Sequence, residues 1–236
     1  MKILWIVPIT GPDEKQLRET DEFLRKYSFA KTEVVIRKVN RGTESIESRL
    51  DEVYASVPIL EEVKKGEKEG FDACVIACAG DAGVDVAREI SRFPVIGPGE
   101  AAILISQLLG RRVVVLTSLP GRIPSIEEKV ARFIPPNRFF VYPTNIPVIE
   151  FQKDVNKTLK TLVEIVQKSI AKDRVDTAIL LCLGMQGMAE KVQKEVGIPV
   201  IDPTLAALQM AQAMVKMGLS QAKGFYPFPP EKKRVL

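Results

Sequence analysis

Short apolar runs alternate along the chain with longer stretches whose apolar residues have helical spacing. The runs are rich in β-branched residues and predict strands at Ile3–Ile9, Thr32–Val39, Ala73–Ala77, Val95–Ile96, Val113–Thr117, Phe139–Tyr142, Ala178–Leu181 and Val200–Ile201. The longer stretches, most of which open with Pro, Ser, Thr or Asp, predict helices at Glu14–Lys26, Ile46–Glu69, Gly83–Ile90, Ala101–Leu109, Ile126–Phe133, Val155–Ala171, Met188–Val196 and Leu205–Met217. This alternation predicts parallel βαβ units, and therefore an α/β protein.

The second half of the chain repeats the pattern of the first. The matched positions are, in order, Asp72 with Asp176, Cys78 with Cys182, Gly80 with Gly184 and Gly83 with Gly187. After a slip of one residue, Phe93–Pro98 matches Ile198–Pro203, and upstream Ile3–Val7 resembles Val113–Leu116. A repeat of roughly 100 residues is the size of a small α/β domain. We expect two similar α/β domains with parallel sheets, related by a pseudo-twofold axis, with the active site in the cleft between them.

The repeat places two cysteines at equivalent strand ends. Cys78 and Cys182 each follow a buried apolar run and precede a glycine-containing turn into a helix, which is where open α/β sheets bind ligands. Such turns direct backbone N–H groups at an anion, and the same field lowers a cysteine pKa from about 8.5. The alternative is that each cysteine is simply a small buried residue, as we expect for Cys74, whose counterpart is Ala178.

A thiol and a thiolate that face each other suit proton exchange with opposite faces of one carbon. Inversion then needs no cofactor, but the negative charge on the adjacent carbonyl must be held by amide or hydroxyl donors. Thr10, Thr117 and Ser118, at the ends of the other repeated strands, are candidate donors. The alternative is that these hydroxyls only cap turns.

Composition excludes several other kinds of chemistry. The chain has no histidine, so it has no Cys-His nucleophile, Ser-His-Asp triad or histidine-bound zinc, and it has no Gly-Lys-Ser/Thr phosphate loop. We expect no metal and no cofactor. Three cysteines form no disulfide framework and favour a reducing, cytoplasmic location.

Charge and hydropathy limit the classes of binding partner that we expect. The net charge of +4 is spread along the chain, which does not favour nucleic-acid binding. No apolar run approaches a membrane span, and the first run lacks a signal-peptide cleavage site. A small-molecule substrate is the expected partner.

These motifs resemble those of the hydantoin/allantoin racemases, within the aspartate/glutamate racemase superfamily. The resemblance rests on five blocks in order: Ser45–Glu47 with Asp51 and Glu52; Cys78–Gly83 with Val86–Glu89; Pro94–Ala102; Val115–Ser118; and Cys182–Met185 with Ile198–Asp202. It implies that Cys78 and Cys182 are the acid/base pair and that the protein forms homo-oligomers. It also implies that the chain crosses between domains, which places one domain at residues 1–97 plus 206–236 and the other at 98–205.

Several positions depart from the family pattern. The opening loop usually reads Asn-Pro-Asn-Thr, whereas this chain has Val7-Pro8-Ile9-Thr10; Ala79 and Ala82 replace a common aromatic residue and proline, and Leu183 replaces a small residue. The predicted substrate-binding residues are Ile9, Thr10, Ala79, Gly80, Asp81, Thr117, Ser118, Leu183, Gly184 and Met185.

The leading hypothesis is a cofactor-independent racemase or epimerase that acts at a carbon next to a carbonyl, with 5-substituted hydantoins as the first substrate class. The alternatives are an aspartate or glutamate racemase and a maleate-isomerase-like enzyme. Similar decarboxylases of arylmalonates need only one cysteine, so the paired thiols argue against that reaction. A different class, a non-catalytic binding protein with two lobes, shares the domain arrangement and would not need the thiols.

Overall fold

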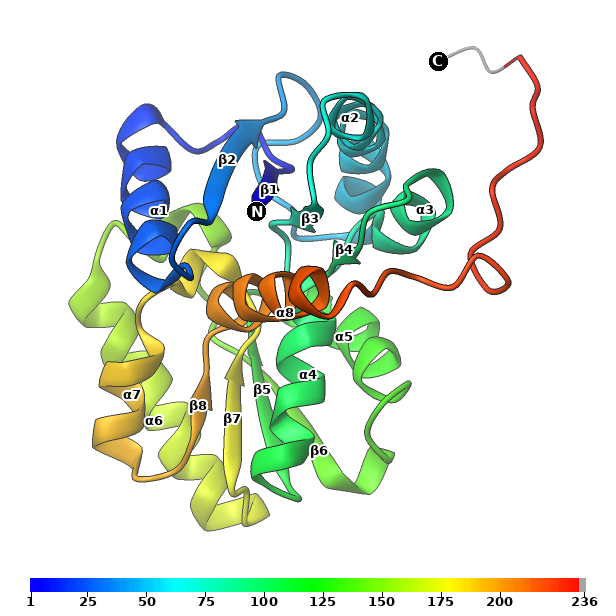
Figure 1. The fold of residues 1–236 in the computed structure, drawn as a ribbon. Coiled ribbons are helices and arrows are strands. Elements are labelled where there is room, and N and C mark those ends of the chain that lie inside the picture. Colours follow the sequence, from blue (N-terminus) through cyan, green and yellow to red (C-terminus); the bar gives the residue numbers. More distant parts are fainter. Residues whose placement is uncertain (234–236) are drawn as a thin grey trace.

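The computed structural model describes residues 1–233, which form two four-stranded sheets (Figure 1). The first sheet, in the order β2-β1-β3-β4, contains β1 (Lys2–Val7), β2 (Glu33–Lys38), β3 (Ala73–Ile76) and β4 (Val95–Ile96). The second, in the order β6-β5-β7-β8, contains β5 (Val113–Thr117), β6 (Phe139–Pro143), β7 (Thr177–Leu180) and β8 (Val200–Ile201). All pairings are parallel, and equivalent strands occupy equivalent places. The predicted α/β class with two similar parallel sheets is confirmed.

Helices cover both sheets. They are α1 (Glu14–Tyr27), α2 (Arg49–Lys68), α3 (Val84–Ile90), α4 (Pro98–Leu109), α5 (Ile123–Val130), α6 (Val155–Asp173), α7 (Ala189–Val196) and α8 (Pro203–Met217). The described residues also contain short 3₁₀ segments that the sequence pattern did not predict, namely η1 (Pro120–Arg122), η2 (Pro136–Arg138), η3 (Val148–Glu150) and η4 (Leu183–Met185). Strands β3, β5 and β7 are buried along their whole length, as expected when helices cover both faces of a parallel sheet. No helix within residues 1–233 is long and apolar enough to cross a membrane.

The observed element boundaries correct the predicted ones. Helices α4, α5 and α8 begin two or three residues earlier than expected, because each has a proline in its first turn, where no N–H donor is needed. Helix α2 begins at Arg49 instead of Ile46, because the Ser48 hydroxyl accepts a hydrogen bond from the Asp51 N–H and caps the helix. Strand β1 ends at Val7 instead of Ile9: Pro8 has no N–H, and the Thr10 N–H bonds the Thr43 carbonyl.

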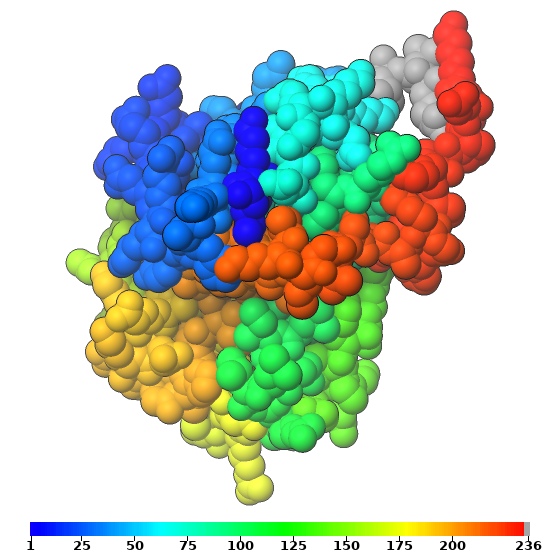
Figure 2. All heavy atoms as spheres, in the orientation of Figure 1, coloured from blue at the N-terminus to red at the C-terminus, as the bar shows by residue number. Residues whose placement is uncertain are grey.

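The chain crosses between the halves twice. Helix α4 follows β4 of the first sheet but packs against β7 and β8 of the second, whereas α8 follows β8 and packs against β3 and β4 of the first (Figure 1). On one face the atoms of α8 fill the junction between the halves (Figure 2). One apolar core therefore contains Trp5, Ile103, Val115 and Leu208 from both halves. The domain boundaries predicted at residues 97/98 and 205/206 lie near these crossings and stay a prediction; residues 234–236 of the first predicted domain lie outside the described residues.

Candidate active site

The turn that follows β3 surrounds the sulfur of Cys78 with N–H donors. The backbone amides of Gly80 and Ala82 donate hydrogen bonds to this sulfur, and the Asp81 N–H donates to the Cys78 carbonyl at 2.8 Å. Asp81 has a φ of 55° and Gly83 a φ of 72°, so two left-handed residues close the turn before α3. The side chain of Cys78 is partly exposed.

Cys182 occupies the equivalent turn after β7. Its N–H bonds the Leu180 carbonyl at 2.7 Å, as the Cys78 N–H bonds the Ile76 carbonyl at 2.7 Å. The Gly184 N–H donates to the Cys182 sulfur, and this thiol is also partly exposed. The internal repeat therefore extends to the local geometry of both thiols.

Burial and charge set the protonation of the two thiols. Burial raises the pKa of Cys182 to about 12 and also raises that of Cys78. The amide hydrogen bonds lower both values but do not outweigh burial, so the lowered cysteine pKa expected from the turns is wrong. A charge on Cys78 raises the pKa of Cys182, so the sulfurs lie close enough to interact electrostatically. Asp81 raises the pKa of Cys78 in the same way, and Glu47 raises that of Cys182. Cys74 is fully buried within β3, where burial alone raises its pKa.

Two of the three predicted hydroxyl donors lie at a strand end, whereas Thr10 lies in the loop after β1. Thr117 and Ser118 are buried at the end of β5, and their carbonyls accept the N–H groups of Thr144 and Asn145 at 2.8 and 2.9 Å. The Thr10 hydroxyl donates to the Thr43 carbonyl at 3.2 Å. These contacts hold the backbone at the end of β5 and in the loop after β1.

The other predicted binding residues divide into two groups. Gly80 and Gly184 lie beside the sulfurs of Cys78 and Cys182, and Ile9 and Leu183 are partly buried against the core that joins the halves. The second group consists of three residues whose side chains already contact other parts of the protein. Ala79 and Met185 are buried in apolar clusters, and the Asp81 carboxylate accepts the Gly99 and Glu100 N–H groups and the Lys129 ammonium, each at 2.8 Å.

A family model described as Asp/Glu/Hydantoin racemase matches residues 14–211, most of the chain. The chain belongs to this racemase family. A hydantoin racemase from Pseudomonas sp. (strain NS671) is 35% identical over 207 residues, which cover 86% of this chain and 83% of that protein. The allantoin racemase structure from Klebsiella pneumoniae has a TM-score of 0.91 at 28% identity, covering 98% of this chain and 95% of that chain. The one from Pseudomonas fluorescens has a TM-score of 0.92 at 28% identity and covers both chains completely. The predicted family and enzyme class, an isomerase, are confirmed.

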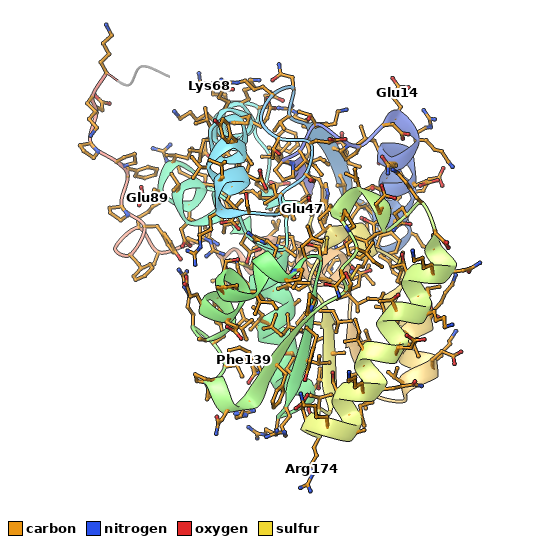
Figure 3. All side chains as sticks on the ribbon, turned by 180° about the vertical axis from the view of Figure 1, so that it is seen from behind. Glu14, Glu47, Lys68, Glu89, Phe139 and Arg174 are labelled. Atoms are coloured by element: carbon orange, nitrogen blue, oxygen red, sulfur yellow. The ribbon has the colours of Figure 1, made fainter. Side chains whose placement is uncertain are left out.

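Three charged residues of the racemase near the thiols were not among the predicted site residues. Glu47 lies at the junction of the halves (Figure 3), where its carboxylate accepts the Val148 N–H at 2.7 Å. Glu52 on α2 pairs with the buried Arg122 at 2.6 Å. Both glutamates belong to motifs that carry the family resemblance, whereas a single arginine in a proline-rich turn gives no sequence signal. Within residues 1–233, no three Cys, Asp or Glu side chains are grouped as metal ligands would be.

Proposed function

We propose that this racemase inverts C5 of 5-substituted hydantoins by exchanging a proton with Cys78 and Cys182, without a cofactor. One observation carries the proposal: two partly exposed thiols occupy equivalent turns on separate sheets, each accepts backbone N–H bonds, and the two interact electrostatically. A single structural cysteine would need neither the equivalent turn nor the partner.

The reaction exchanges the protonation states of the two sulfurs. One thiolate removes the C5 proton, the C–H electron pair moves into the neighbouring carbonyl to form an enolate, and the other thiol donates its proton to the opposite face. Because a charge on one sulfur raises the pKa of the other, ionisation of one thiol keeps its partner protonated, which gives the one thiolate and one thiol that the reaction needs. Thr117 and Ser118 are our candidates to donate hydrogen bonds to the enolate oxygen.

The hydantoin ring is the substrate class that the chain's apolar substitutions favour. Val7, Ile9 and Leu183 stand where the family pattern usually has polar or small residues. Burial of an amino acid's ammonium and carboxylate needs several polar partners, whereas a hydantoin ring has far less charge to desolvate. The proteins named hydantoin and allantoin racemases support this choice, since allantoin is a hydantoin with a ureido group at C5.

A panel of enantiopure substrates tests the proposal by polarimetry, after exhaustive dialysis of the enzyme against a chelator. We expect faster loss of optical rotation with 5-alkyl and 5-arylalkyl hydantoins than with aspartate or glutamate, at a rate that dialysis does not change. A preference for the free amino acids would contradict the proposed substrate class. A requirement for added metal or pyridoxal phosphate would contradict the cofactor-independent mechanism.

A further inference from the structure

Arg122 is a buried cation that has no role in the two-thiol mechanism as described above. Only 4% of this residue is exposed, and its Nη2 donates a hydrogen bond to the Glu52 carboxylate at 2.6 Å. Its Nη1 is buried and has no hydrogen-bond partner among residues 1–233. A half-satisfied guanidinium is costly in a protein interior, so its position here calls for a function.

The Arg122 guanidinium can approach the turn that contains Cys78 because residue 80 is a glycine and has no side chain. A Cβ atom added to Gly80 would lie 2.9 Å from Arg122 Nη2 and 3.3 Å from Cys78 Sγ. The cation and the sulfur therefore flank the same small space. Arg122 comes from the second half of the chain, at the end of η1, whereas Cys78 and Glu52 belong to the first.

The charge of Arg122 acts on both sulfurs. It lowers the pKa of Cys78 and the pKa of Cys182, against the effects of burial and of the neighbouring carboxylates Asp81 and Glu47. Two of the other charged groups nearby are engaged with each other, since the Lys129 ammonium pairs with the Asp81 carboxylate at 2.8 Å.

We propose that Arg122 is a positioning residue that provides one fixed positive charge for both acid/base thiols, so that each sulfur can carry the negative charge in turn. This inference rests on the proposed two-thiol mechanism. Each turnover moves the negative charge from one sulfur to the other. A cation that acted on only one sulfur would stabilise the negative charge there and make its transfer to the other sulfur costly, whereas a shared cation keeps the two charged states close in free energy.

Glu52 holds this cation in place and partly neutralises it. Arg122 is more buried than Lys129 and Arg49, the cations of two other ion pairs between the halves. The Glu52 side chain is 26% exposed. Asp51, on the same helix, also interacts electrostatically with Arg122. Burial raises the pKa of the Asp51 carboxyl, but hydrogen bonds from Glu47 and Ser48 outweigh burial and hold that pKa below its usual range. Removal of the Glu52 charge should therefore increase the effect of Arg122 on the thiols, while removal of Arg122 should abolish it.

The test is the pH dependence of alkylation of each thiol by iodoacetamide, a neutral reagent, followed by mass spectrometry of the Cys78 and Cys182 peptides. In Arg122→Gln we expect both pH midpoints to rise, and alkylation at a fixed pH below the midpoint to slow about tenfold per unit of that rise. Arg122→Lys keeps the charge and should stay near the wild type. Glu52→Gln keeps a hydrogen-bond acceptor and should lower both midpoints. The control is Arg49→Gln, which removes the exposed pair with Glu128 between the same halves and should change neither.

Opposite shifts in Arg122→Gln and Glu52→Gln, on both thiols, are the result that a merely structural role would not give. Unchanged midpoints in Arg122→Gln, a shift of only one thiol, or an upward shift in Glu52→Gln would overturn the inference. If circular dichroism shows that Arg122→Gln does not fold, the downward shift in Glu52→Gln decides, and its absence overturns the inference. Alkylation needs no turnover, so its result can be told apart from a failure of the proposed function. The proposed function fails if Cys78→Ser and Cys182→Ser both racemise the substrate at the wild-type rate.

Discussion

Cys78 and Cys182 differ from Cys74 in what surrounds the sulfur. All three thiols have a pKa raised by burial, but only the two at strand ends accept backbone N–H bonds and interact with Arg122. Their place in the repeat and the glycine two residues later predicted the equivalent turns that the structure has, whereas their role as the acid/base pair stays a prediction. Arg122 and its contact with Gly80 were not predictable, because a single charged residue has no pattern and the contact joins the two halves of the chain.

The raised thiol pKa values set the direction of the pH dependence. Because burial raises both values, the thiolate fraction is small near neutral pH and grows as pH rises toward the pKa of the pair. We expect kcat/KM for racemisation to increase between about pH 6 and 8, by up to about tenfold per unit, when initial rates are followed by polarimetry. A rate that is constant or falls over this range would mean that a different group is the base.

At the scale of elements, the beginning of α4 supports the Cys78 turn. The Asp81 carboxylate caps α4 through the N–H groups of Gly99 and Glu100, where a negative charge is favourable. Strand positions were predictable from runs of buried apolar residues, but helix starts were not. Each of α4, α5 and α8 takes a proline into its first turn, and the apolar pattern that locates a helix begins only after that turn.

A pair of glycine substitutions tests whether the beginning of α4 supports the Cys78 turn. A Cβ at Gly99 would lie 2.1 Å from the Ala79 carbonyl oxygen, so we expect Gly99→Ala to displace the turn, lower the free energy of unfolding by about 1–3 kcal/mol and reduce the racemisation rate. At Gly121 the added Cβ would have no neighbour within 4 Å. Gly121→Ala is therefore the control and should unfold within a few degrees of the wild type. Equal melting temperatures and rates for the two variants would show that the contact is unimportant.

At the scale of the whole molecule, the two halves are joined by a shared core and by ion pairs. Helices α4 and α8 each pack on the sheet of the other half, and one apolar cluster includes Trp5, Ile103 and Leu208. The repeat predicted two sheets with equivalent strands, and the family resemblance implied that the chain crosses between them. The pairs Arg122–Glu52, Lys129–Asp81 and Arg49–Glu128, which the sequence pattern could not show, connect residues 122–129 to the first half.

A shared core predicts that the halves unfold together. Separation of the sheets would expose the apolar faces of α4 and α8, so neither half keeps its core alone. Differential scanning calorimetry of the whole chain should show one transition whose calorimetric and van't Hoff enthalpies agree. Two resolved transitions would contradict the shared core and favour independently stable domains.

The central claim is that each thiol serves one face of the substrate carbon, and hydrogen exchange in deuterium oxide tests it most directly. Cys78→Ser and Cys182→Ser should each lose racemisation in both directions, because a hydroxyl is too weak an acid and base. The remaining thiol should still exchange the C5 proton of one enantiomer of a 5-substituted hydantoin for deuterium, and the two variants should act on opposite enantiomers. Cys74→Ala, which alters only a core residue, should keep both reactions. Racemisation near the wild-type rate in both serine variants, or exchange of the same enantiomer by both, would contradict the account.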